Sequence, residues 1–166
     1  MYDKLTQSDI DKMKEEIEYR KLVVRKQALE DVKEARSHGD LSENFEYHAA
    51  KQVKNKNESR IRYLERMIRT AEVISDTSKE DEIGINNTVE IRMEEDGSVE
   101  KYRIVTTVRG NSLEGLISNE SPLGKALLGH KAGDKVHITV NADFGYDVTV
   151  ISIEKTGDEG DKIREF

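Results

Sequence analysis

Two series of residues at helical spacing, all apolar except Asn57, constrain the fold of the first 75 residues more than any other feature. The first series is Ile10, Met13, Ile17, Val24, Ala28, Val32 and Ala35, and the second is Ala50, Asn57, Ile61, Leu64, Ile68 and Ala71. Steps of three, four and seven give each helix one stripe, as in coiled coils. Only residues 38–47 separate the series, so the two helices must pack antiparallel. A first helix from about Ser8 to Ser37 would extend roughly 45 Å.

Beyond residue 84 the apolar pattern changes to a period of two. The segments NTVEIRM, VEKYRIV, KVHITV and YDVTVISIE predict strands, with a further strand near 113–117. SPLGKALLG, residues 121–129, has Ser-Pro at its start and Gly at its end, which predicts a short helix. We therefore expect an α+β chain made of an antiparallel coiled-coil hairpin over 1–75 with an acidic tip at 38–47, a linker over 76–83, a small α+β domain over 84–156 and a disordered tail over 157–166.

Composition excludes several classes of protein. The chain has no cysteine, which excludes disulfides, thiolate metal sites and cysteine nucleophiles. It has no stretch of 18 apolar residues and no signal-peptide pattern, so we expect a cytoplasmic protein without a membrane partner. No Walker loop, G-x-S-x-G, H-E-x-x-H or Rossmann fingerprint occurs, so the sequence does not support an autonomous enzyme. We also expect the chain to be a monomer.

The acidic residues of HGDLSENFEY, residues 38–47, allow two interpretations. D-L-S-E fits a capping box in which Asp40 is the N-cap of the second helix and Glu43 returns to its backbone N–H. The same two carboxylates could instead hold part of a Mg²⁺ shell, because Mg²⁺ takes about six oxygen ligands and a partner could supply the rest. Ser8 and Asp11 offer a similar start signal for the first helix.

Basic residues on the shaft behind the tip favour a phosphate-bearing partner. Residues 51–69 contain seven Lys and Arg against two Glu, and such a surface could attract the end of a nucleic acid. The alternative is that these charges are only solvated, as is usual on coiled coils. His38, Asp40, Glu43 and His48 can also be drawn as a transition-metal cluster, although their spacing is not a specific signature.

ARSHGDLSENFEYHAAKQ and RIRYLERMIRTAEVI closely resemble the tip and second helix of the Gre family of bacterial transcript-cleavage factors, GreA type. The resemblance continues through YRIV and SPLGKALLGHKAGDKV. It implies an FKBP-like second domain that docks on the rim of the RNA polymerase secondary channel, while the hairpin enters the channel. Prolyl isomerase activity does not follow from that fold.

The resemblance also implies roles for individual residues. Asp40 and Glu43 would help to hold a Mg²⁺ ion shared with the polymerase, which then cleaves its own backtracked RNA. The free chain is not expected to bind that ion tightly. Arg36 and Lys51 would lie near the 3′ end of the nascent RNA, and the docking residues would be Ser121, Pro122 and Leu123.

The sequence departs from the family pattern in three places. The usual proline of the first helix is absent around Arg25-Lys26-Gln27, which should leave that helix straighter. NADFG stands where a P-G-G turn is common, and the chain continues beyond the usual end at Lys155.

Three other functions compete with transcript cleavage. A Gre paralogue could occupy the channel and inhibit or modulate the polymerase without cleavage. A coiled-coil adaptor or chaperone would have an apolar or uniformly polar tip rather than acidic residues backed by Lys and Arg. A free-standing metallonuclease would have to complete a metal shell with tip residues alone.

Overall fold

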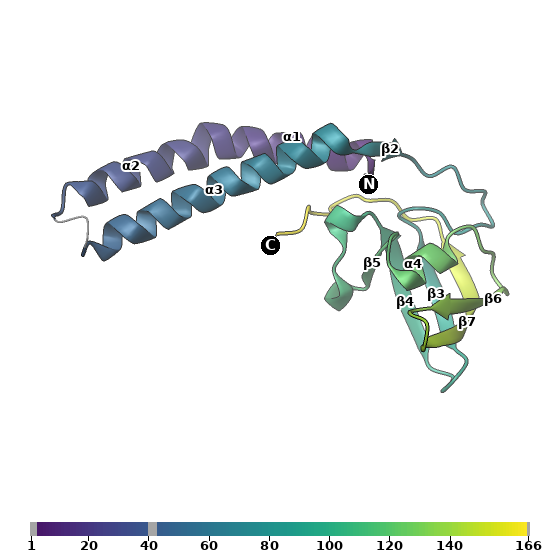
Figure 1. Cartoon of the computed structure of the whole chain (residues 1–166). Helices are drawn as coiled ribbons and strands as arrows, with labels where there is room; N and C mark the ends of the chain where they lie inside the picture. The colour runs from purple at the N-terminus through teal and green to yellow at the C-terminus, as the bar shows by residue number, and fades with distance from the viewer. Residues whose placement is uncertain (1–2, 40–42, 166) are drawn as a thin grey trace. The chain divides into compact units, whose positions relative to one another are not determined.

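The computed structural model describes residues 3–39 and 43–165, which form two compact units. One unit is Ile10–Ala71, and the other joins Asp3–Asp9 to the chain from Glu72 onward. The first is a helical hairpin and the second contains a β-sheet, so the predicted α+β class is confirmed (Figure 1). Within the described ranges, every helix is too short or too polar to cross a membrane.

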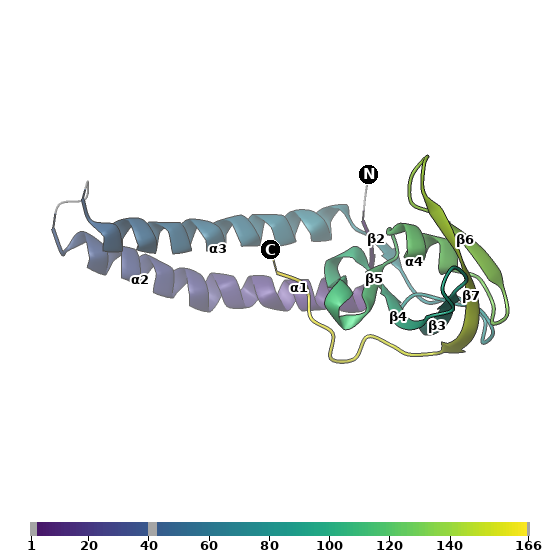
Figure 2. The same cartoon turned by 90° about the horizontal axis from the view of Figure 1, so that it is seen from below.

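The first arm of the hairpin is built from three consecutive helical segments. These are α1 (Gln7–Tyr19), the π-helix η1 (Arg20–Val24) and α2 (Arg25–Arg36), and the second arm is α3 (Phe45–Thr70). The arms lie side by side in both views (Figures 1 and 2). Their contact buries most of the predicted stripe together with Met67, which lies outside it: Ile10, Met13, Ala28, Ala35, Asn57, Ile61, Leu64 and Met67.

The π-helix interrupts the arm that the sequence predicts to be straighter. The backbone N–H of Arg25 donates to the carbonyl of Arg20, five residues back, where an α-helix would bond four residues back. The predicted stripe has no member between Ile17 and Val24, and Leu22 and Val23 are exposed here at 65% and 48%. The first arm is therefore not an uninterrupted α-helix, although no proline occurs in it.

A partly buried polar cluster joins the two arms. The guanidinium of Arg20 donates to Asn57 Oδ1 (3.0 Å), and Asn57 Nδ2 donates back to the carbonyl of Arg20 (3.3 Å). Glu16 accepts from Arg20 (2.7 Å) and from Arg60 (2.8 Å). Burial alone would raise the pKa of Glu16, but these two arginines outweigh it and hold the pKa below its ordinary value. The cluster forms in only one alignment of the arms, so it favours one register.

The second unit is a five-stranded sheet with the order β5-β4-β3-β7-β6. Its elements are β3 (Thr88–Met93), β4 (Val99–Val105), β5 (Leu116–Ser118), α4 (Pro122–Leu127), β6 (Lys135–Thr139) and β7 (Gly145–Glu154), with short 3₁₀ turns η2 (Thr107–Arg109) and η3 (Ser112–Glu114). Neighbouring strands are antiparallel except β4 and β5, which are parallel. Alternate residues such as Ile91 and Val150, which pair across β3 and β7, face the core with Leu127 of α4.

The sequence did not predict a second, two-stranded sheet in this unit. Strand β1 (Lys4–Thr6) pairs in parallel with β2 (Glu72–Ile74), and Leu5 is completely buried. Directly after β1, Thr6 and Asp9 form a reciprocal cap, with Thr6 N–H donating to Asp9 (3.0 Å) and Asp9 N–H donating to Thr6 Oγ1 (3.2 Å). The start signal is thus Thr6 with Asp9, and not Ser8 with Asp11.

The segments expected to be a linker and a disordered tail both contact the sheet unit. Ile83, in the predicted linker, is 1% exposed and belongs to the core. In the predicted tail, Asp161 lies between Arg103 and Arg109, and the backbone N–H of Arg164 donates to the carbonyl of Val108 (2.7 Å). Residues 157–165 are therefore attached to the unit rather than free.

Candidate functional site at the hairpin tip

One asparagine side chain joins the ends of the two arms at the tip. Asn44 is the N-cap of α3, where its Oδ1 accepts from the backbone N–H of Tyr47 (3.1 Å). Its Nδ2 donates to the carbonyl of Ala35 in the last turn of α2 (2.7 Å). A single side chain thus caps the start of α3 and hydrogen-bonds to the last turn of α2.

This geometry corrects the capping-box interpretation of the acidic pair. Since α3 begins at Phe45, the N-cap position belongs to Asn44, and Glu43 precedes it. Asparagine is as good an N-cap as aspartate, so the sequence contained the signal, but D-L-S-E matched the better-known pattern. Asp40 lies outside the described residues, and its place at the tip stays a prediction.

Replacing Asn44 by alanine should loosen the tip. We expect the free energy of unfolding of the hairpin to fall by about 1 kcal/mol, since a lost N-cap costs about 0.5–2 kcal/mol. Urea denaturation followed by far-UV circular dichroism measures this. Asn55→Ala, at an exposed position within α3, is the matched control and should leave stability unchanged or slightly higher. Equal losses in both variants would contradict the capping role of Asn44.

Glu43 is exposed in the turn before α3, where its carboxylate is open to solvent. Phe45, the next residue but one, is 86% exposed, which is unusual for a large apolar side chain. The tip therefore presents a carboxylate and an aromatic ring together.

The two basic residues predicted to lie near RNA meet at one aromatic ring. The guanidinium of Arg36, from α2, lies 5.5 Å from the centroid of the Tyr47 ring, and the ammonium of Lys51, from α3, lies 5.9 Å from it. A hydrogen bond from Arg36, with the nearby charge of Lys51, lowers the pKa of the Tyr47 hydroxyl. The sequence analysis gave Tyr47 no role. In the structure its ring contacts both cations, and it lies four residues after Glu43 in the sequence.

The two histidines of the tip have separate contacts. His38 Nδ1 lies 2.8 Å from Glu46 Oε2, and this hydrogen bond raises the pKa of His38. The His48 ring packs against the Tyr47 ring at 5.4 Å between centroids. No group of three metal-ligating side chains is found in the described part of the chain. Asp40, which belongs to the four-residue cluster suggested above, lies outside that part.

The predicted docking residues form the start of α4 in the sheet unit. Ser121 is the N-cap and accepts from the backbone N–H of Gly124 (3.1 Å), and Pro122 occupies the first helical position. Leu123 is half-buried against the core, whereas Pro122 is exposed. A Cβ on Gly124 would lie 2.1 Å from the carbonyl oxygen of Ser118, so this tight turn requires glycine. Pro122 is thus the member of the trio most open to a partner.

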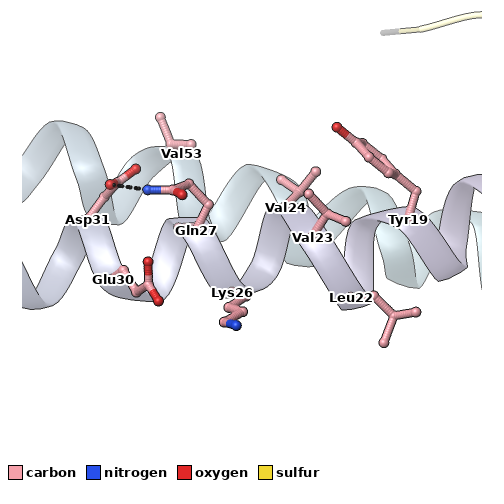
Figure 3. Close-up of a pocket in the computed structure, with 10 residues that line it drawn as sticks. Tyr19, Leu22, Val23, Val24, Lys26, Gln27, Glu30, Asp31 and Val53 are labelled. Carbon is pink, nitrogen blue, oxygen red and sulfur yellow. Dashed lines mark hydrogen bonds between the residues drawn. The ribbon is translucent and has the colours of Figure 1, made fainter.

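A shallow hollow on the shaft is a further surface that the sequence analysis missed. It has a volume of about 520 Å³ and lies along η1 and α2 (Figure 3). Tyr19 and Val23 of the first arm and Val53 of α3 contribute exposed apolar surface to it. The π-helix is the feature that interrupts the regular stripe at this point.

Comparison with known proteins identifies the family. Residues 4–73 match the model "Transcription elongation factor, N-terminal", and residues 77–155 match "Transcription elongation factor, GreA/GreB, C-term". "Transcription elongation factor GreA" of Streptococcus gordonii is 44% identical over 154 residues, covering 92% of this chain and 95% of that protein. The protein of the same name from Streptococcus sanguinis is 43% identical over the same shares of the two chains.

Among solved structures, one titled "Structure of the transcription factor Gfh1" has a TM-score of 0.45 at 28% identity, covering 92% of this chain and 97% of the other. That structural likeness is too low to support an argument. The two family models together match residues 4–73 and 77–155, and the two relatives are 44% and 43% identical over 92% of the chain. The chain belongs to the GreA/GreB family of transcription elongation factors.

Proposed function

We propose that this elongation factor binds RNA polymerase, inserts its hairpin into the secondary channel and stimulates the polymerase to cleave backtracked RNA. The observation that carries the proposal is the tip, where Glu43 is exposed and the cations of Arg36 and Lys51 meet at the Tyr47 ring. A carboxylate suits a metal-bound water, and two cations behind it suit an RNA phosphate.

A shared Mg²⁺ fits the groups that the tip offers. Carboxylate oxygens are preferred ligands of this ion, and the exposed side chain of Glu43 is open to a partner. When bound, the ion would complete a two-metal arrangement with the polymerase, in which one ion activates a water for attack on the phosphodiester and the other stabilises the leaving oxygen. Glu43 and Asp40 would supply oxygen ligands, while Arg36 and Lys51 would orient the RNA 3′ end. The chain acts by completing a site in the polymerase, and is not itself an enzyme.

The proposal is tested on backtracked elongation complexes stalled at a defined position. Adding the protein with Mg²⁺ should release short 3′ RNA fragments and restart elongation. The protein incubated with the same RNA, but without polymerase, should release none. Absence of fragments from the stalled complex, with slowed elongation, would instead support the inhibitory paralogue. Cutting of free RNA would contradict the shared site.

A further inference from the structure

The C-terminal segment 157–165 supplies a carboxylate to two arginines of the sheet unit. Asp161, whose side chain is 7% exposed, accepts from Arg103 Nη1 (2.7 Å), from Arg103 Nη2 and from Arg109 Nη1 (2.7 Å). The carbonyl of Gly157 accepts a further bond from Arg103 (2.9 Å). In Figure 2 the segment is the yellow trace that continues from β7. A bidentate, nearly buried contact of this kind is a specific arginine–carboxylate pair.

The arginines belong to the part of the chain that matches the family model, whereas Asp161 does not. The match ends at residue 155. Every side-chain hydrogen bond of Arg103 found in the described residues goes to the segment beyond it. The two arginines that bind the carboxylate thus belong to the matched range 77–155, and the carboxylate belongs to the segment 157–165 beyond it.

One nitrogen of the Arg109 guanidinium makes no hydrogen bond to the described residues. Its side chain is completely buried, with Nε bonded to Asp9 (2.6 Å) and Nη1 bonded to Asn86 (2.7 Å) as well as to Asp161. Its Nη2 is buried and finds no hydrogen-bond partner among the described residues. A buried guanidinium nitrogen that lacks an acceptor is costly, and one more acceptor would remove that cost.

The segment fills only part of the surface around the arginines. Arg103 and Arg109 line an open hollow of about 1380 Å³, together with Lys101, residues 110–118 and residues 160–165. Leu113 belongs to this lining and is 97% exposed. The hollow therefore combines cations with an apolar side chain and has room for an extended peptide.

We propose that Arg103 and Arg109 form a binding site for the carboxylate of an acidic peptide segment, and that residues 157–165 occupy it as an intramolecular ligand that such a peptide can displace. The occupant already present defines the ligand: a chain segment that presents one carboxylate to both guanidiniums and runs beside Val108. This site goes beyond the tip and beyond transcript cleavage.

The experiment uses the full chain with one substitution in the segment. Asp161→Asn removes the charge that the arginines bind, and Glu159→Gln is the matched control, because Glu159 is exposed on the same segment. A fluorescent peptide with the sequence of residues 156–166 is titrated into each protein, and anisotropy is recorded. A second peptide carries D161N.

The Asp161→Asn protein should bind the unaltered peptide at least about tenfold more tightly than the wild type or Glu159→Gln does. A tethered ligand acts at an effective concentration of about millimolar, so the intact segment excludes a micromolar competitor. The peptide with D161N should bind none of the three proteins. Hydrogen exchange at Arg164 N–H should be faster in Asp161→Asn than in Glu159→Gln, while the core strands stay protected.

Three outcomes would overturn the site. One is equal binding of the unaltered peptide to all three proteins, and another is no binding to Asp161→Asn while its core strands remain protected. The third is binding of a single-stranded oligonucleotide in preference to the peptide, which would assign the arginines to phosphate. If Asp161→Asn loses core protection, Asp161→Lys with Arg103→Glu, which exchanges the charges, replaces it. In that protein the segment should again occupy the site, so Arg164 N–H should exchange hydrogen nearly as slowly as in the wild type and more slowly than in Arg103→Glu alone. Equally fast exchange in these two variants would overturn the site.

Discussion

Replacing Glu43 or Asp40 by alanine should lower the rate of polymerase-dependent RNA cleavage by at least about 10- to 100-fold. Loss of groups that only support metal ligands already costs that much, so loss of a ligand should cost no less. Binding to the polymerase should change little, because the proposed docking residues Ser121, Pro122 and Leu123 lie in the sheet unit. Single-turnover release of labelled 3′ fragments, combined with a binding titration, separates the two quantities.

Glu34→Gln is the control for this prediction, because Glu34 is an exposed carboxylate in the last turn of α2, close to the tip. It removes one negative charge without removing a proposed ligand, and it should cleave at nearly the wild-type rate. Higher Mg²⁺ should partly restore the alanine variants, since weaker coordination shifts the binding equilibrium. Full activity of Glu43→Ala and Asp40→Ala would remove both residues from the site while leaving the proposed function standing.

Replacing Asp9 by alanine should destabilise the sheet unit by about 3–5 kcal/mol, because it leaves the charge of Arg109 buried with less compensation. Both side chains are completely buried, and Asp9 also accepts from Thr106 Oγ1 (2.7 Å) and from the backbone N–H of Thr6 (3.0 Å). Guanidinium denaturation monitored for the sheet unit measures the loss. Glu15→Ala, at an exposed position of α1, should change stability by less than about 1 kcal/mol.

A double variant identifies the cause of that loss. If uncompensated charge dominates, Asp9→Ala combined with Arg109→Met should be more stable than Asp9→Ala alone, because both charges leave the interior together. Additive losses from the two single substitutions would show instead that packing and the cap at Thr6 dominate.

The sequence predicted those elements whose residues repeat at a regular period. The stripe from Ile10 to Ala35 and the alternation in β3, β4 and β7 report burial on one face, which depends on local spacing and is visible without tertiary information. The family resemblance likewise rested on contiguous motifs, and the comparisons confirmed it.

What the sequence did not reveal depends on contacts between distant residues. Asp9 looks like one more charge at a helix start, and only the fold brings it to Arg109, 100 positions away. The strands β1 and β2 are three residues each, too short for a period to be visible. Asp161 similarly lies in a segment of disordered-like composition, which the buried Arg109 and the partly buried Arg103 hold in place.

At the tip, the predicted basic residues Arg36 and Lys51 are brought together, but by Tyr47, for which the sequence gave no reason. The acidic pair is described only at Glu43. The cap was misassigned because Asp40 and Asn44 are equally good N-cap residues four positions apart, and the choice between them depends on where the turn closes.

The two arms of the hairpin are continuous with the paired strands β1 and β2. The chain enters it just after Thr6 and returns at Glu72, and these residues belong to neighbouring strands. Because helix rise is fixed at 1.5 Å per residue, adding or deleting seven residues in each arm would move Glu43 by about 10 Å along the arms while leaving both strands in place. The number of residues in the two arms therefore sets how far along the hairpin Glu43 lies from the ends of the two arms.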